Sequence, residues 1–93
     1  MAKGTYHKRP VGVGVTLTPA GASVNSVLSS DYPFIHVYST ADVHLVFGAT
    51  APTAVADETC LYIKGTTPYI FPINPGEYVA VIGTATVELH YME

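Results

Sequence analysis

The sequence has little charge, no tryptophan and one cysteine. Charged residues make up 12% of the 93 positions and hydrophobic residues 48%, against roughly 25% charged residues in a typical soluble domain. A chain of this length forms one small domain with a thin core. So few charges cannot cover its surface, and we expect part of the exterior to be buried against copies of the chain or a larger partner.

The single cysteine excludes an intrachain disulfide and the disulfide framework of small secreted domains. Cys60 lies in "ETCLYIK", an expected strand, where a lone cysteine usually behaves as a small buried hydrophobe. The opening "MAKGTYHKRP" is positive, but the apolar core of a signal peptide does not follow it, and no apolar run reaches the ~18 residues of a membrane helix. We expect a protein made in the cytoplasm, without a membrane span.

The basic residues are concentrated at the start of the chain. Three of the four fall in the first ten positions: Lys3, Lys8 and Arg9. From Val11 onward one basic and seven acidic residues give a net charge of −6. We expect residues 1–12 to form a basic arm that binds a partner and residues 13–93 to form a single domain; the alternative is a solvated end without a partner. The body lacks the clustered Lys and Arg of a nucleic-acid surface.

Seven prolines and eight glycines leave few windows for a helix, and alternation of apolar and polar residues dominates instead. The alternating segments are residues 11–18, 22–29, 33–39, 43–48, 59–65, 68–73, 77–83 and 85–92. Turn residues separate them, which predicts an all-β fold: a small antiparallel β-sandwich, jelly-roll-like, or a flattened barrel of about eight short strands. We expect the long stretch 48–59 to be a loop that crosses between sheets.

The segments 33–39 and 43–48 look like a hairpin. Pairing Ser39 with Val43 keeps Ile35 and Val37 on the same face as Val43, Leu45 and Phe47. A three-residue loop remains, with Asp42 expected in the left-handed region.

In this register Tyr38 pairs with His44 on the opposite face, and His36 is diagonal to His44. We expect a similar hairpin from 77–83 and 85–92. Its second strand places Glu88 and His90 on one face.

Side chains of metal-ligand type lie on several expected strands: His36, His44, His90 and Glu88. They lack the spacing of a zinc site, and we expect them to hydrogen-bond on a half-solvated face, although a symmetric oligomer that gathers copies of one histidine stays open. Cys60 has no activating motif beside it, and "GVGVTLTPAG" lacks the pattern of a phosphate-binding loop. We therefore expect no enzymatic activity, no metal and no cofactor.

Two blocks, "YSTADVHLVFGATAPTA" and "TPYIFPINPGEYVAVIGTATVELHYME", give the chain a resemblance to known proteins. The matching places are Ser39 to Asp42, Phe47-Gly48, Ala51 to Ala54, Thr67 to Tyr69, Pro75-Gly76, Ala80 to Ile82 and Glu93. In this pattern the chain resembles the small β-sandwich head decoration, or cement, proteins of tailed bacteriophages, which are encoded beside the major capsid protein. Glu77 and His90 depart from the family pattern, and the residues before 33 lie outside it.

The resemblance implies a virion structural protein that binds the outside of the major capsid lattice and stabilises the head. We expect a homo-oligomer, a dimer or trimer, located on the capsid surface. The expected partner-binding residues are Lys3, Tyr6, His7, Lys8, Arg9, Tyr38 and His44. The alternative is a phage tail or receptor-binding module, or a carbohydrate-binding sandwich that uses tyrosine side chains and the 48–59 loop.

Overall fold

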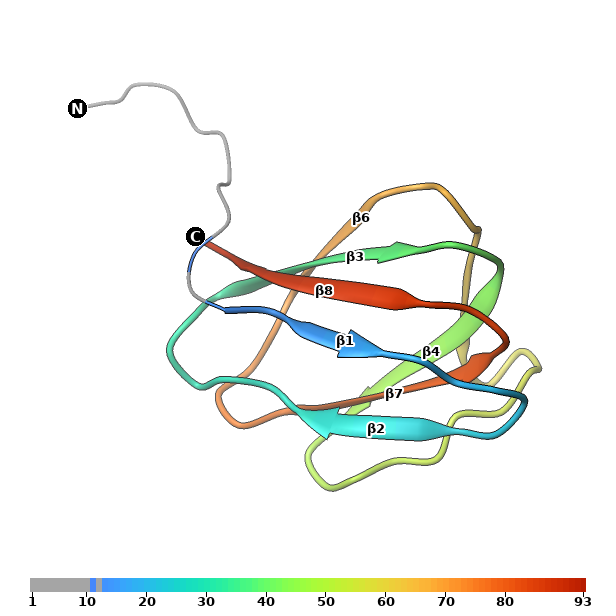
Figure 1. Cartoon of the computed structure of the whole chain (residues 1–93). Helices are drawn as coiled ribbons and strands as arrows, with labels where there is room; N and C mark the ends of the chain where they lie inside the picture. The colour runs from blue at the N-terminus through green and yellow to red at the C-terminus, as the bar shows by residue number, and fades with distance from the viewer. Residues whose placement is uncertain (1–10, 12) are drawn as a thin grey trace.

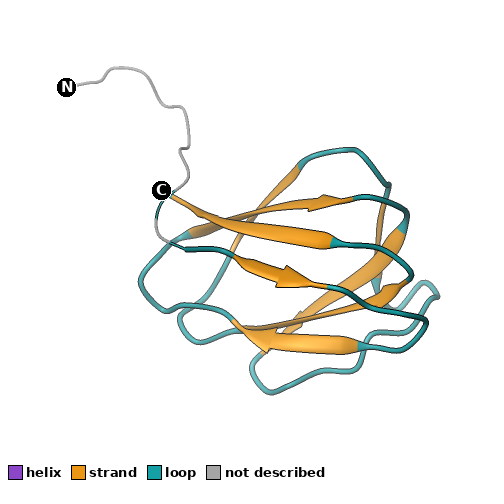
Figure 2. Ribbon diagram, viewed as in Figure 1, coloured by secondary structure: helices purple, strands orange, loops and turns teal. Residues whose placement is uncertain are grey.

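The computed structural model describes residue 11 and residues 13–93 (Figure 1). Eight antiparallel strands form two four-stranded sheets, and the described residues contain no helix (Figure 2). Each of the eight alternating segments of the sequence contains one of these strands. The predicted all-β sandwich is therefore confirmed.

The first sheet contains, in spatial order, β1 (Val15–Leu17), β8 (Val87–Met92), β3 (Phe34–Ser39) and β6 (Tyr69–Pro72). The second sheet contains β2 (Val24–Val27), β7 (Tyr78–Gly83), β4 (Val43–Gly48) and β5 (Leu61–Ile63). Strands from the two halves of the chain alternate in each sheet: β1 pairs with β8, β2 with β7, β3 with β6 and β4 with β5. This is the winding of a long hairpin rolled around itself, as in a jelly roll.

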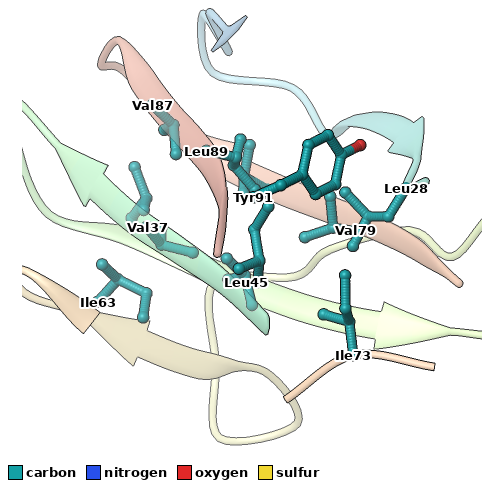
Figure 3. Close-up of a cluster of buried hydrophobic side chains, with 12 residues drawn as sticks. Leu28, Val37, Leu45, Ile63, Ile73, Val79, Val87, Leu89 and Tyr91 are labelled. Atoms are coloured by element: carbon teal, nitrogen blue, oxygen red, sulfur yellow. The ribbon is translucent and has the colours of Figure 1, made fainter. Parts of the chain in front are cut away.

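The core is a layer of aliphatic side chains between the two sheets (Figure 3). In β3 and β8 every second residue points inward, so that Ile35, Val37, Val87 and Leu89 have no exposed surface. Inward residues of the second sheet meet them, chiefly Val43, Leu45, Ile63, Val79 and Val81. Such alternation, with one face dry and the other wet, is what an antiparallel sandwich requires.

A tyrosine closes the core at the end where the chain terminates. Tyr91 is 6% exposed, and its hydroxyl accepts a hydrogen bond from the Ser29 backbone N–H at 2.9 Å. Its ring stacks on Tyr32 with 5.1 Å between the ring centroids. The link between β2 and β3 is thereby fixed to β8, and the one polar group of this side chain has a partner.

Both predicted hairpins are wrong. β3 belongs to the first sheet and β4 to the second, and the same holds for β8 and β7. The three residues after Ser39 therefore form an arch between the sheets. Thr66, with φ 60°, is the only non-glycine residue with positive φ in the described part of the chain, so Asp42 is not left-handed as expected.

The physical reason is that alternation fits both arrangements. In a hairpin the apolar residues of two strands line the same face of one sheet, whereas in an arch they point at each other from two sheets. Ile35 and Leu45 are buried in either case. Alternation therefore identifies the inward residues but not the partner strand.

The long loop was also expected to cross between sheets, but it connects β4 to β5, which are neighbours in the second sheet. Midway along it, the Ala54 N–H donates to Ser23 Oγ at 2.9 Å, beside β2 at the far edge of this sheet. Since the inner side is filled by the core, the loop has to pass over the outer side of β7. Ala80, whose side chain lies on that side, has no exposed surface.

Replacing Leu89 by alanine tests whether the layer between the sheets carries the stability of the fold. We expect Leu89→Ala to lower the free energy of unfolding by about 2–5 kcal/mol, because the buried side chain leaves a cavity. Ile70→Ala is the control: Ile70 is an aliphatic residue on β6 of the same sheet but is 46% exposed, and its loss is expected to be at most about 1 kcal/mol. Urea denaturation measures both, and equal losses would contradict the assignment.

Candidate functional site

The outer face of the first sheet gathers polar and aromatic side chains from its two central strands. We call this group, His36, Tyr38, Glu88 and His90, the imidazole face. β3 presents His36 and Tyr38 outward because the residues between them point into the core, and β8 presents Glu88 and His90 for the same reason. The prediction that Glu88 and His90 share a face is confirmed.

Strand pairing brings the four side chains together. His36 lies directly opposite His90, and Tyr38 lies opposite Glu88. The imidazole rings are 6.1 Å apart between centroids and tilted by 54°, and His90 Nε2 lies 3.4 Å from Glu88 Oε1. The side chains of His90 and Glu88 are about half exposed, at 49% and 54%. The face therefore offers ring surface and hydrogen-bonding groups to a macromolecular partner.

Apolar groups continue this face toward the sheet edge. On β6, Ile70 lies opposite His36 and is 46% exposed. On the other side, Thr16 of β1 lies opposite Glu88. The only carboxylate among these residues is Glu88, so the face carries little of the acidic charge of the body.

The structure does not join Tyr38 and His44, which were expected to pair. Tyr38 is on the outer face of the first sheet, whereas His44 is on the outer face of the second. There His44 lies between Tyr62 and Ile82, and its ring meets the Tyr62 ring edge-on at 5.6 Å. A flat docking surface can therefore contain one of the two residues but not both.

The remaining expected contact residues, Lys3, Tyr6, His7, Lys8 and Arg9, lie outside the described residues. Val11, which belongs to the expected arm 1–12, donates its backbone N–H to the Tyr91 carbonyl at 2.8 Å. Val11 therefore lies beside the end of β8, in the sheet that carries the imidazole face.

A second polar cluster ties together turns of the two sheets. Asp42 Oδ1 accepts the Gly65 N–H at 2.7 Å, and Asp42 Oδ2 accepts the Tyr62 hydroxyl at 2.5 Å. These hydrogen bonds, that of Gly65 foremost, hold the pKa of Asp42 below its ordinary value. The hydrogen bond that the Tyr62 hydroxyl donates to Asp42 raises the pKa of Tyr62. The cluster positions the arch after β3 against the turn after β5, which is a structural role.

Cys60 is half-buried at the end of the long loop. Its Sγ accepts a hydrogen bond from the Val55 N–H, with 3.3 Å between sulfur and nitrogen. Within residues 11 and 13–93, no three His, Cys, Asp and Glu side chains are placed to hold a metal ion together. Nor does this part of the chain contain a helix with the length and hydrophobicity needed to cross a membrane.

The tyrosines do not form a common platform among the described residues. Tyr38 is on the outer face of the first sheet, Tyr62 and Tyr78 belong to the second, and Tyr91 is in the core. The Tyr69 hydroxyl accepts the Lys64 N–H at 3.1 Å, and its ring stacks beside Phe71. Stacking of one sugar on several tyrosines therefore has no matching surface here.

Comparison with protein families, with curated proteins and with solved structures finds no match for this chain. Its function is therefore inferred from its residues, its fold and the resemblance described above.

The Asp42 cluster predicts a dependence of stability on pH. The pKa of Asp42 is lower in the folded than in the unfolded chain, so its ionised form stabilises the fold above the unfolded pKa, and this contribution is lost as pH falls through the folded pKa. We expect Asp42→Asn to lower the melting temperature at neutral pH and to approach the parent below about pH 4. The control is Asp31→Asn. Asp31 is exposed, and its side chain makes no hydrogen bond to another residue in the part of the chain that the structure describes. Thermal melts across this range that run parallel for the parent and Asp42→Asn would contradict the expectation.

Proposed function

We propose that this protein is a bacteriophage capsid decoration protein that binds the outside of the major capsid lattice and stabilises the head. The observation that carries the proposal is that an eight-stranded sandwich has outer surfaces that are apolar, aromatic and weakly charged. Large hydrophobic side chains are exposed at Val13, Val27, Val55, Leu61, Tyr62 and Ile70. Exposed apolar surface on a small domain is typical of an interaction module.

The family resemblance supports the same conclusion. Its blocks fall on the strands that build the sandwich: the arch from β3 to β4, the loop over the second sheet, and β6 to β8. What the resemblance implies about partners comes with it: the major capsid protein, further copies of this chain, and a place on the virion surface. A fold of this type serves many functions, so the contact surface has to be argued from the residues.

The imidazole face and the basic arm are the contact surfaces that we propose. The outer side of the second sheet is partly covered by its own loop, whereas His90 and Glu88 on the first sheet are half exposed. Val11, within the expected arm, is hydrogen-bonded to the same sheet. A flat face that packs on the lattice and a charged arm that complements acidic patches would supply affinity and register respectively.

Co-sedimentation with undecorated, expanded capsids from the same source tests the proposal. We expect stoichiometric binding that raises the temperature at which the particles break open. Protein lacking residues 1–10 is expected to bind more weakly while its melting temperature stays unchanged. A well-folded protein that does not bind the capsids would contradict decoration and favour a tail or carbohydrate-binding module, which a glycan array would then detect.

Substitutions of Tyr38 and His44, which lie on opposite sheets, test which face docks on the capsid. We expect Tyr38→Ala to weaken capsid binding at least about tenfold, the effect of truncating a central contact residue. His44→Ala, the matched change on the outer face of the second sheet, is expected to have little effect. The opposite ranking in a binding titration would assign docking to the second sheet, and equal losses would exclude a single flat face.

A further inference from the structure

The two sheets are open and therefore have four edge strands: β1 and β6 in the first, β2 and β5 in the second. An edge strand presents backbone N–H and C=O groups that another strand can pair with. In an antiparallel ladder these groups point alternately toward the neighbour and away from it. Hydrogen bonds at the strand ends show which residues point outward.

The edge of β6 is blocked by prolines. Ile73 donates its N–H to the Pro33 carbonyl at 3.0 Å, in register with the β3–β6 ladder. Backbone groups alternate along the strand from this bond. Those of Phe71 therefore point toward β3, and those of Pro68, Ile70 and Pro72 point outward, that is, away from the sheet at its free edge. Proline has no N–H, so Ile70 is left as the only outward donor of this stretch.

β5 and β1 are short and offer little more. In β5 the outward residue is Tyr62, and the N–H groups that flank it are occupied: Cys60 donates to the Asp57 carbonyl and Lys64 to the Tyr69 hydroxyl. In the three-residue β1, alternation leaves Thr16 as the outward residue. Each of these strands therefore presents one residue for pairing.

β2 is the exception. Leu28 donates its N–H to the Glu77 carbonyl at 2.7 Å, in register with the β2–β7 ladder. Alternation from this bond directs the backbone of Ser26 toward β7 and that of Asn25 and Val27 outward. Among the described residues, β2 is thus the edge that presents two successive sets of outward N–H and C=O groups, and it contains no proline. The Val27 carbonyl accepts the Ser26 hydroxyl at 3.2 Å, which leaves its second lone pair for a partner strand.

We propose that β2 pairs with β2 of a second copy of this chain, antiparallel and around a two-fold axis at Ser26. Asn25 then lies opposite the partner's Val27, and Val27 opposite the partner's Asn25, so that both residue pairs exchange N–H···O=C hydrogen bonds. The two four-stranded sheets become one continuous sheet. A contact of this kind is closed by symmetry and yields a dimer rather than a filament.

The charge distribution permits a second copy at this edge. Residues 11–93 carry a net charge of −6, so two of these domains repel each other in most relative orientations. β2, with the sequence VNSV, has no ionisable side chain. The nearby Glu77 carboxylate is turned into its own turn, where Oε1 accepts the Asn74 N–H at 3.0 Å.

Apolar surface lies beside this edge. Val27 is 53% exposed, and Val55, which follows the loop residue bonded to Ser23, is 45% exposed. Figure 1 shows β2 along one margin of the molecule, with the long loop running beside it. These valines add hydrophobic contact around the backbone hydrogen bonds, as a specific interface requires. The dimer rests on the self-association included in the proposed function, but its contact lies away from the imidazole face, so it can be tested without capsids.

A pair of proline substitutions tests this interface in the full-length chain. Asn25→Pro removes an outward N–H and leaves the β2–β7 ladder intact, and Thr16→Pro makes the same change on the edge of β1. We expect the parent and Thr16→Pro to be dimers in sedimentation equilibrium, and Asn25→Pro to have a dissociation constant at least about tenfold higher, because the symmetric contact loses two hydrogen bonds. Hydrogen exchange is expected to show the Asn25 and Val27 amides protected in the dimer.

The outcomes separate the possible occupants. If Asn25→Pro does not fold, Val27→Lys, which places a charge at the same edge, is expected to show the same dissociation. A monomeric parent at about 100 μM would overturn the proposal, since specific dimers persist at that concentration. An oligomer that Asn25→Pro and Val27→Lys leave intact, or one that disappears when residues 1–10 are removed, would assign self-association to another surface and overturn it as well.

Discussion

Packing of the inward aliphatic side chains of β3 and β8 against those of β4 and β7 is the interaction on which the rest of the structure depends. These four strands are central in their sheets, and the side chains between them have almost no exposed surface. The chain passes between the sheets through the short arch after Ser39 and the turn before Val87, and the Thr40 N–H donates to the Thr86 carbonyl at 3.0 Å where the two meet. The imidazole face exists because the opposite sides of β3 and β8 are fixed by this layer.

Much of the fold follows from the sequence because period-two alternation is a local property. It located all eight strands, and it placed Glu88 and His90 on a common face. The sequence could not show which strands are neighbours, since His36 and His90 are brought together by a ladder between distant segments. For the same reason Tyr38 and His44 were paired wrongly: an arch and a hairpin bury the same residues.

The two outer faces of the sandwich are not equivalent. The loop between β4 and β5 crosses the second sheet and buries Ala80, and the Ala54–Ser23 hydrogen bond holds it there. The first sheet has its half-exposed histidine and glutamate instead, and Val11 is hydrogen-bonded to its strand β8. In the proposed account, docking on a capsid uses the first sheet, while the free edge of the second sheet at β2 pairs with another copy. In this proposal, a small, weakly charged domain buries its apolar surface in two separate contacts.

We propose that this protein binds the outer surface of a capsid through its first sheet. Cryo-electron microscopy of capsids reconstituted with the protein tests it most directly. We expect additional density on the outside of the shell, into which the sandwich fits with β3 and β8 facing the lattice. Density that places β4 and β7 against the shell, or a shell identical with and without the protein, would contradict it.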